Sequence, residues 1–368
     1  MARAFFPRRI HLRGRLRVLH LLAWTLALLI AVEVLAQARE YWLFGRSILN
    51  SIVGQPDFVI DTATGLLLLR PNAVIRGRQQ EILSNSLGLR SEELPAGKVS
   101  GQYRVAVIGA SSVMGAYSKT NDDTLPAMLM ARLRAALVGV DVRVINAGIV
   151  GYGLDDQRRM LGYVDDRLHP DLVFVYPGVN DFAGYCRAAR TPGLVNAYPL
   201  PQLELPRWLM SVDLLLKNTV ALRPVAKVSN RVVNASTLDI TAYRERIEKL
   251  VLAARDRGIR LVLSTNARNY RPDQASEVQQ ERARTALFYN PCFGVAGLNT
   301  LYDRHNAVID EVGAKYGVPV LHVGDRVPGE PAYFRDSVHF STEGKALVAQ
   351  MFAEYAVAKY GPVWGRRK

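Results

Sequence analysis

Short apolar runs and stretches with helical spacing alternate along residues 103–360. The apolar runs, typical of buried strands, cover residues 103–110, 142–148, 171–178, 259–265 and 318–323, and helical spacing covers 125–137, 154–164, 243–258, 298–317 and 341–360. Helices of about ten or more residues between strands predict right-handed crossovers and a parallel sheet with helices on both faces. The sequence therefore predicts an α/β doubly wound domain, in which ligands bind beyond the carboxyl ends of the strands.

A longer apolar segment lies near the N-terminus, at residues 18–38. About 20 helical residues, each rising about 1.5 Å, span a hydrocarbon core of about 30 Å, so this segment predicts one membrane-spanning helix. Six arginines and no acidic residue precede it within residues 1–17. The positive-inside rule then places the N-terminus in the cytoplasm. We expect a single-pass protein of the cytoplasmic (inner) membrane whose main domain is exported, to the periplasm or another extracytoplasmic space.

A cleaved signal peptide is the alternative interpretation of this segment, because Ala36-Gln37-Ala38 resembles a cleavage site behind an apolar core. The apolar run is longer than the roughly 7–15 residues of a signal core, which favours an uncleaved anchor. A buried soluble helix fits poorly, since the run is apolar on all faces and adjoins an arginine cluster.

Three parts are expected along the chain. Residues 1–40 form the basic tail and the anchor, residues 41–100 a turn-rich module with short β-prone pieces, and residues 101–368 the α/β domain. Within the last part, residues 187–240 are rich in proline and interrupt the alternation, with a short amphipathic piece at 208–216. This insertion either shapes an acyl or sugar pocket over the sheet or is an ordinary surface excursion.

Charge and cysteine content narrow the function classes. The net charge of +14 comes from 47 Lys+Arg against 33 Asp+Glu, but six arginines in the first 17 residues supply much of it. Without zinc-finger spacing, an RNA-binding strand signature or a basic heptad region, we expect no nucleic-acid partner. The chain has neither a C-x-x-C pair nor an H-E-x-x-H helix, so we expect no metal site. In an exported domain Cys186 and Cys292 can form a disulfide, although nothing in the sequence shows their distance.

Three short blocks follow the first three predicted strands. Block 109–115 places Ser111 in a turn before a helix, whose first N–H groups can face a developing anion. Block 146–153 contains glycines that let the backbone approach a ligand, and block 178–181 contains an asparagine whose amide can bind an oxyanion. Each block also has an ordinary interpretation, namely a helix N-cap, a plain turn or an asparagine that closes a turn.

A fourth block precedes the last predicted helix and places Asp336 three residues before His339. This spacing lets the carboxylate bind one ring nitrogen and leaves the other nitrogen as a base. The other five histidines lie at the membrane end, before a proline, in a predicted helix and in a predicted strand (His11, His20, His169, His305 and His322). Alone, an Asp-x-x-His pair more often has a capping or surface role.

In this order, the four blocks resemble those of the SGNH (GDSL-like) hydrolase superfamily. The resemblance implies a flavodoxin-like three-layer sandwich in which Ser111 is the nucleophile, His339 is the general base and Asp336 orients His339. It also implies an oxyanion hole formed by the N–H groups of Ser111 and Gly151 and the side chain of Asn180. The implied chemistry is acyl transfer through an acyl-enzyme, with no metal or organic cofactor. The substrate-binding residues remain unknown at this point.

The resemblance covers about residues 103–360 and has one departure. Ala110 stands where the family usually has an aspartate. That position supports the loop and is not a triad member, so activity is not excluded. Ser112 is the alternative nucleophile, and Ser111 is preferred because it fills the serine place of the block. Residues 41–100 more loosely resemble the module that precedes the hydrolase domain in some membrane-anchored bacterial SGNH proteins, which suggests a role on envelope or exported polysaccharide.

We therefore expect a membrane-anchored serine esterase that removes acetyl or similar acyl groups from envelope glycans or exopolysaccharide. The alternatives are an O-acyltransferase that uses the same triad, a lipid-ester hydrolase, and a catalytically silent glycan-binding assembly factor. The expected partners are an acylated glycan or another ester substrate and, through residues 18–38, the membrane. Protein partners cannot be inferred from the sequence.

Overall fold

The computed structural model of the chain describes residues 9–44, 57–76, 80–95, 97–188, 209–212, 214–215 and 233–364. These residues belong to two compact units, one built from residues 1–55 and 198–224 and the other from residues 56–197 and 225–368. Most of the predicted insertion at 187–240 and residues 1–8 of the arginine-rich tail lie outside the described residues, so the predictions for both stay predictions.

The first unit contains helix α1 (Arg9–Phe44). Among the described residues, one helical stretch, Leu16–Trp42, is long and apolar enough to cross a membrane, with a mean hydropathy of 2.3. An N-terminal signal sequence meets the same criteria, so the orientation and the fate of the predicted anchor stay predictions. In the same unit, the carboxylate of Glu33 accepts the backbone N–H groups of Met210 and Ser211 at 2.9 and 3.0 Å.

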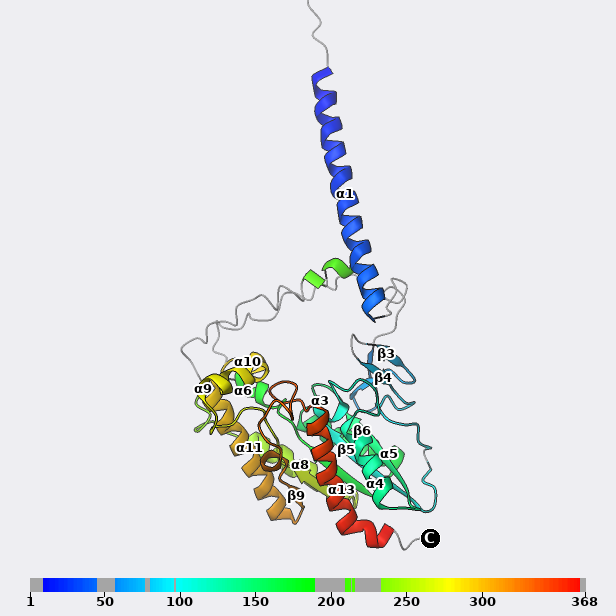
Figure 1. The fold of residues 1–368 in the computed structure, drawn as a ribbon, viewed down its shortest axis with the longest axis vertical. Coiled ribbons are helices and arrows are strands. Elements are labelled where there is room, and N and C mark those ends of the chain that lie inside the picture. Colours follow the sequence, from blue (N-terminus) through cyan, green and yellow to red (C-terminus); the bar gives the residue numbers. More distant parts are fainter. Residues whose placement is uncertain are drawn as a thin grey trace, which may run out of the picture. The chain divides into compact units, whose positions relative to one another are not determined.

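The second unit is built on a five-stranded parallel sheet with the order β6-β5-β7-β8-β9 (Figure 1). Its strands are β5 (Gln102–Gly109), β6 (Asp141–Gly148), β7 (Leu172–Tyr176), β8 (Leu261–Ser264) and β9 (Val320–Leu321). All four neighbouring pairs are parallel. The predicted doubly wound α/β fold is confirmed.

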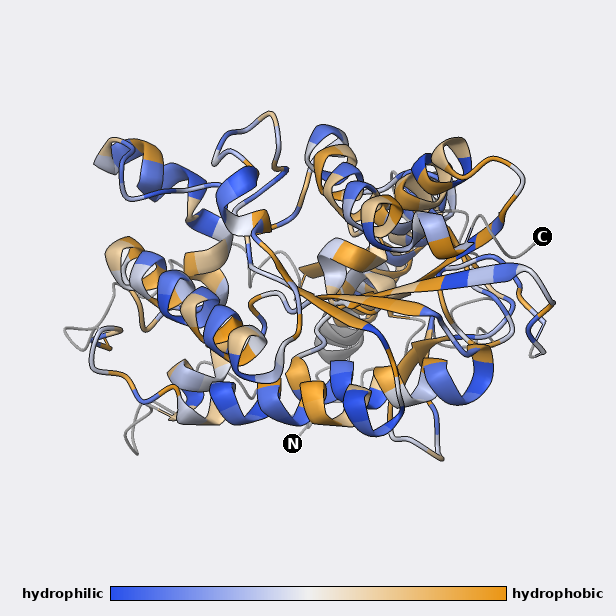
Figure 2. Cartoon of the chain, turned by 90° about the horizontal axis from the view of Figure 1, so that it is seen from below, coloured by the Kyte–Doolittle hydropathy of each residue, from blue (hydrophilic) through white to orange (hydrophobic). Residues whose placement is uncertain are grey.

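Helices cover both faces of this sheet because its strands are apolar on both sides. One face packs against α5 (Leu154–Leu168), α8 (Thr241–Asp256) and α11 (Val295–Tyr316), and the other against α4 (Leu125–Ala136) and α13 (Thr342–Trp364). In β5, Ala106 and Ile108 point into the first core and Val105 and Val107 into the second, as the twofold period of a strand requires. Figure 2 shows the resulting layers, with the mostly apolar strands between helices of mixed polarity.

Several short helices were not predicted. They are α3 (Ser111–Met114), α6 (Phe182–Ala188), α9 (Ser276–Arg282), α10 (Arg284–Tyr289) and α12 (Val323–Arg326). The last predicted strand is shorter than expected. It ends at Leu321, so the placement of His322 in a strand is wrong, and His322 instead precedes α12.

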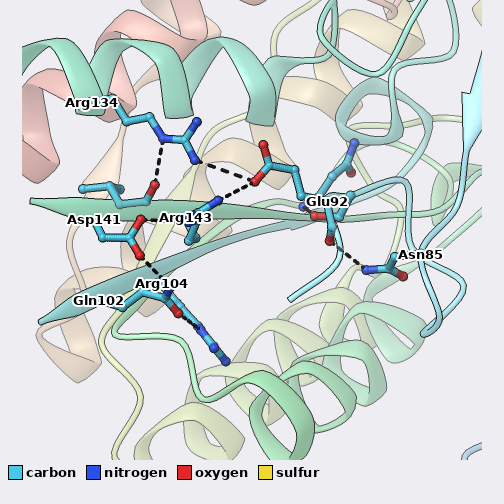
Figure 3. Close-up of polar contacts among 10 residues, drawn as sticks. Asn85, Glu92, Gln102, Arg104, Arg134, Asp141 and Arg143 are labelled. Atoms are coloured by element: carbon cyan, nitrogen blue, oxygen red, sulfur yellow. Dashed lines mark hydrogen bonds and ion pairs between the residues drawn. The ribbon is translucent and has the colours of Figure 1, made fainter. Parts of the chain in front are cut away.

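Residues 57–95 form two antiparallel hairpins that pack with the sheet domain. The hairpins are β1 (Phe58–Ile60) with β2 (Leu67–Leu69) and β3 (Val74–Arg76) with β4 (Glu81–Leu83). Leu66, Ile82 and Leu89 are buried in the same apolar cluster as α5 and the sheet. Glu92 pairs with Arg143 on β6 at 3.1 Å, as Figure 3 shows. The predicted domain boundary at residue 100 stays a prediction.

Candidate active site

The nucleophile candidate lies where β5 ends and α3 begins. A Cβ on Gly109, the last residue of β5, would lie 2.5 Å from a side-chain carbon of Val113 and 2.7 Å from the carbonyl oxygen of Tyr176. Only glycine therefore lets the strand end so close to α3 and β7. Ser111 is the first residue of α3, so its backbone N–H has no partner within the helix and faces the carboxyl end of the sheet.

The structure brings Ser111, His339 and Asp336 together. The hydroxyl oxygen of Ser111 lies 2.8 Å from Nε2 of His339, and Nδ1 of His339 lies 2.7 Å from Oδ2 of Asp336. The second carboxylate oxygen of Asp336 accepts the backbone N–H groups of Val338 and His339, both at 2.9 Å. The contacts match the predicted triad, and the roles of its members stay predictions.

The carboxylate of Asp336 is held in its ionised form. Burial alone would raise the pKa of Asp336, but the hydrogen bond and charge of His339 and the two backbone N–H groups outweigh it and lower this pKa below its usual value. An ionised carboxylate orients the imidazole and stabilises the imidazolium that forms when a serine loses its proton.

Ser112 also lies in this region but has a different contact. Its hydroxyl donates to the carbonyl oxygen of Val338 at 3.4 Å, whereas the contact with His339 belongs to Ser111. The neighbouring Ala110 is buried at the turn. Geometry therefore favours Ser111 over Ser112 as the nucleophile.

The predicted oxyanion donors line the same cavity as Ser111. Gly151 has a φ of +79°, a conformation that residues with a Cβ rarely adopt, and it lies on the turn before α5. The side-chain nitrogen of Asn180 donates to the carbonyl oxygen of Tyr152 at 3.0 Å, which ties it to that turn. Asp181 accepts the backbone N–H of Leu154 at 3.1 Å, so block 178–181 holds the turn through two consecutive side chains.

A cavity of about 390 Å³ opens beside these groups. Its lining comprises five alanines, three valines, three tyrosines and small polar residues (Ala110, Ser111, Ser112, Ala116, Val150, Gly151, Tyr176, Gly178, Val179, Asn180, Ala183, Ala267, Thr285, Ala286, Tyr289, Asn290, Tyr302, Val338 and His339). The described lining contains no aspartate, glutamate, lysine or arginine side chain. The cavity is therefore suited to a neutral, mainly apolar group.

Two features of the site were not predicted as part of it. Tyr117, in the loop after α3, donates its hydroxyl to Asp336 at 3.1 Å. Helix α10 contributes Thr285, Ala286 and Tyr289 to the cavity. No sequence signal marks either feature, because both depend on contacts between residues distant along the chain.

The two cysteines form a disulfide between the walls of this cavity. Cys186 on α6 is bonded to Cys292, and their Cα atoms are 5.4 Å apart. Ala183 on α6 and Asn290, two residues before Cys292, both line the cavity. The disulfide that the sequence left open is therefore present, and it joins two segments that enclose the candidate substrate site.

The described residues contain no group of three or more His, Cys, Asp or Glu side chains that could hold a metal ion. A site that works without a cofactor stays a prediction.

Comparisons with known proteins give the family. The sequence profile of the GDSL-like Lipase/Acylhydrolase family matches residues 107–347. No curated protein matches the chain in sequence. Similar solved structures include a lipase/acylhydrolase from Enterococcus faecalis, with 17% identity and a TM-score of 0.40 over 70% of this chain and 96% of that one. Another is a GDSL-like lipase from Bacteroides thetaiotaomicron, with 16% identity and a TM-score of 0.39 over 70% of this chain and 88% of that one.

A catalytic mutant of an acetylxylan esterase from Geobacillus stearothermophilus has 15% identity and a TM-score of 0.41 over 74% of this chain and 100% of that one. These structural similarities carry no argument about the substrate. The family match is stronger evidence, because it covers well over half of the 368 residues and includes all four blocks of the site from Ser111 to His339. The chain therefore belongs to the GDSL-like Lipase/Acylhydrolase family of ester hydrolases.

Proposed function

We propose that the protein is a membrane-anchored serine esterase in which Ser111 carries the acyl group as a covalent ester. One observation carries this proposal: Ser111, His339 and Asp336 form a continuous chain of contacts at 2.8 and 2.7 Å on the wall of a cavity. A hydroxyl, an imidazole and a carboxylate in this order are the groups that activate a serine for attack on an ester.

In the first step, the hydroxyl oxygen of Ser111 attacks the ester carbonyl carbon while Nε2 of His339 takes the hydroxyl proton. The carbonyl oxygen becomes an oxyanion, which the N–H groups of Ser111 and Gly151 and the amide of Asn180 stabilise. One amide hydrogen of Asn180 is used on Tyr152, and the second goes to the oxyanion. The carbon–oxygen bond to the alcohol then breaks, and His339 returns the proton to the leaving oxygen.

In the second step, water attacks the acyl carbon of the Ser111 ester. His339 takes a proton from this water and then donates it to the oxygen of Ser111 as the acid leaves. Ser111 and His339 thereby return to their starting protonation states, with one ester and one water converted into an acid and an alcohol. A sugar hydroxyl in place of water would make the same site an acyltransferase.

The substrates we propose are acetyl or similar acyl esters of envelope glycans or exopolysaccharide. The uncharged, mainly apolar cavity supports a neutral acyl group. Tyr289 lines the cavity and is 65% exposed, so its ring offers an apolar face with a polar tip to a sugar at the entrance. The apolar helix α1 supports a membrane anchor, and we propose that the catalytic unit is exported to the periplasm or another extracytoplasmic space.

The first test uses the full chain in detergent with a fluorophosphonate serine probe and aryl esters of increasing acyl length. We expect Ser111→Ala to abolish both labelling and hydrolysis. The matched control is Ser112→Ala, the adjacent hydroxyl in the same cavity, which we expect to retain both. Loss of labelling only in Ser112→Ala would reject Ser111 as the nucleophile, and a folded wild-type protein that neither labels nor hydrolyses would favour the silent glycan-binding alternative.

The second test separates hydrolysis from transfer. Wild-type protein is given an acetyl donor ester with and without a deacetylated glycan, and released acetate and acetylated glycan are both quantified. Esterase activity predicts acetate as the main product in both cases. Acetylated glycan formed at the expense of acetate would instead identify an acyltransferase.

A further inference from the structure

The hydroxyl of Tyr117 binds the same carboxylate oxygen that holds His339. It donates to Oδ2 of Asp336 at 3.1 Å, while Nδ1 of His339 lies 2.7 Å from this oxygen. The ring of Tyr117 also contacts the imidazole edge to face, with 5.5 Å between the ring centroids. Burial, and after it the charge of Asp336, raises the pKa of Tyr117 to about 12, so this hydroxyl keeps its proton and donates at neutral pH.

The loop that carries Tyr117 is bound by a buried arginine from the segment before the catalytic domain. The side chain of Arg90 is buried, and its guanidinium donates to an unusual number of acceptors on this loop: the carbonyl oxygens of Met114 (3.3 Å), Gly115 (2.8 Å), Ser118 (3.2 Å) and Thr120 (2.8 Å) and the side-chain oxygen of Asn121 (3.0 Å). Gly115 and Ser118 stand on either side of Tyr117, so one cation fixes both ends of the turn that presents the tyrosine.

A second buried cation supports the same turn from α13. Nζ of Lys345 donates to the hydroxyl of Ser118 at 2.7 Å and to the carbonyl oxygen of Asp123 at 2.6 Å. At Gly115 φ is +91°, and a Cβ there would lie 2.7 Å from a side-chain carbon of Thr124, so the turn requires glycine at this point.

Arg90 is hard to replace in this position. Burial lowers the pKa of Arg90 to about 10, so the guanidinium stays charged at neutral pH, and its charge is balanced by carbonyl dipoles. A side chain of similar length without donors would leave these buried carbonyl groups without partners, which costs more than the hydrogen bonds themselves contribute. We therefore expect the turn to rearrange when Arg90 is lost, and Tyr117 to move with it.

We propose that Tyr117 is a positioning residue for the Asp336–His339 pair and that Arg90 fixes Tyr117 in place. The proposal rests on the proposed roles of Ser111, His339 and Asp336. The proposal also gives a role to residues 41–100, which the resemblance connected only loosely with polysaccharide. Through Arg90, this segment supports the active site.

The test compares Tyr117→Phe and Arg90→Met with Arg104→Met in the full chain. Arg104 is a matched control, because it is also buried and donates to the carbonyl oxygens of Leu168 (2.9 Å) and Pro95 (3.0 Å) and to Gln102 (2.7 Å; Figure 3). It lies near the first residue of β5, whereas the candidate site follows the last. We expect Arg104→Met to lower the melting temperature and keep kcat. We expect Arg90→Met to lower both the melting temperature and kcat.

Tyr117→Phe should lower kcat about 5- to 20-fold and change KM less than about twofold, because the tyrosine acts on the catalytic pair. The acidic limb of the pH–rate profile should move up by about 0.5 pH unit, since the carboxylate oxygen is no longer shared and the imidazolium binds it more strongly. Besides Asp336 and His339, the charged or titratable groups that act on Tyr117 are Tyr289 and Arg335, and all four stay unchanged in this variant. The double variant Tyr117→Phe/Arg90→Met should have the same kcat as Arg90→Met alone, because both changes remove the same constraint on Asp336 and His339.

A readout without turnover separates this proposal from the proposed function. The proton between Nδ1 of His339 and Asp336 is followed by its low-field NMR resonance, which we expect to shift in Tyr117→Phe and Arg90→Met and to stay in place in Arg104→Met. If wild-type protein hydrolyses no ester, the proposed function fails and the resonance still decides the role of Tyr117. An unchanged resonance in Tyr117→Phe, or an equal shift in Arg104→Met, would overturn the inference.

Discussion

The two sides of the active site are held by different kinds of interaction. On one side, the loop at 114–121 is fixed by hydrogen bonds from Arg90 and Lys345 to backbone and hydroxyl oxygens. On the other, α6 and the segment after α10 are joined by a disulfide and by an apolar cluster that includes Phe182 and Tyr302. The first side carries Tyr117, which contacts Asp336 and His339, and the second forms much of the cavity wall.

This difference matches what each side has to keep constant. Hydrogen bonds are directional, so they fix the angle at which a side chain meets its neighbour. A disulfide and apolar packing fix the separation of two segments but impose little orientation on the side chains that face the cavity. We therefore expect changes on the first side to act on kcat, and changes on the second to act on stability and KM.

The largest effect is expected for Asp336→Asn, which changes the acceptor shared by His339 and Tyr117. An amide cannot balance the imidazolium that forms in the transition state and can hold the ring in the wrong tautomer, so kcat should fall about 10⁴-fold while KM changes little. Steady-state hydrolysis of an aryl ester measures both constants. A loss of less than about tenfold would mean that Asp336 does not orient His339 or balance its charge in the transition state.

The second prediction concerns the disulfide side. Replacing Cys186 and Cys292 together with serine should lower the free energy of unfolding by about 2–4 kcal/mol, because the bond closes a long stretch of chain, with a sequence separation of 106. KM for longer acyl esters should rise while kcat stays within about twofold. Denaturant unfolding and chain-length kinetics of the double variant, and of wild-type protein under reductant, measure these effects. A selective loss of kcat would erase the distinction between the two sides.

The third prediction concerns the stability of the disulfide side at acidic pH. His305 on α11 is buried, lies 2.9 Å from the hydroxyl of Tyr185 and stacks on Tyr243. Burial lowers the pKa of His305 from 6.5 to about 3. The unfolded chain therefore binds more protons between these values, and stability falls as pH decreases through this window, by about 2 kcal/mol at pH 5.

His305→Phe should flatten this dependence, as unfolding midpoints at pH 7 and pH 5 would show. An equal acid sensitivity in His305→Phe and wild-type protein would show that another group causes it.

The smallest effect is expected for Asp181→Asn. This variant tests whether the kind of interaction or the side on which it lies decides between an effect on kcat and an effect on KM. Asp181 directly precedes α6, but it acts through hydrogen bonds, with 3.1 Å to the N–H of Leu154 and 3.1 Å to a guanidinium nitrogen of Arg246. Weakening these bonds should loosen the turn with Gly151 and lower kcat about 5- to 10-fold. Asp155→Asn is the control, because Asp155 pairs with the same Arg246 at the surface. If Asp181→Asn raises KM instead, the side on which a residue lies, and not its kind of interaction, determines which kinetic constant changes.

The sheet could be anticipated because it depends on short-range patterns, whereas the triad was expected from the resemblance to a known family. Buried strands such as β5 are continuous apolar runs, and the three-residue spacing of Asp336 and His339 is visible in the loop itself. The oxyanion candidates were also expected from the resemblance, because each block alone has an ordinary interpretation. That all these residues meet at one edge follows from the rule that ligands bind beyond the carboxyl ends of parallel strands.

Tyr117 and Arg90 could not be anticipated in this way. Tyr117 reaches Asp336 across 219 positions, and nothing near Arg90 in the sequence indicates that its charge is buried against backbone carbonyls. Helix α9 was missed for a different reason: it has no buried residue, so it lacks the apolar stripe by which a helix is recognised. The boundary at His322 was misplaced because β9 pairs with β8 over only two residues.

Cys292 has a further property that concerns how this chain can vary. It is bonded to Cys186, and its carbonyl oxygen accepts the backbone N–H of Val233 at 2.9 Å. The described chain on either side of residues 189–232 is therefore attached to one residue. Since the entropy of closing a loop grows only with the logarithm of its length, doubling the length of this segment would cost about 0.6 kcal/mol. We therefore expect the stability of the sheet to depend little on how long this segment is.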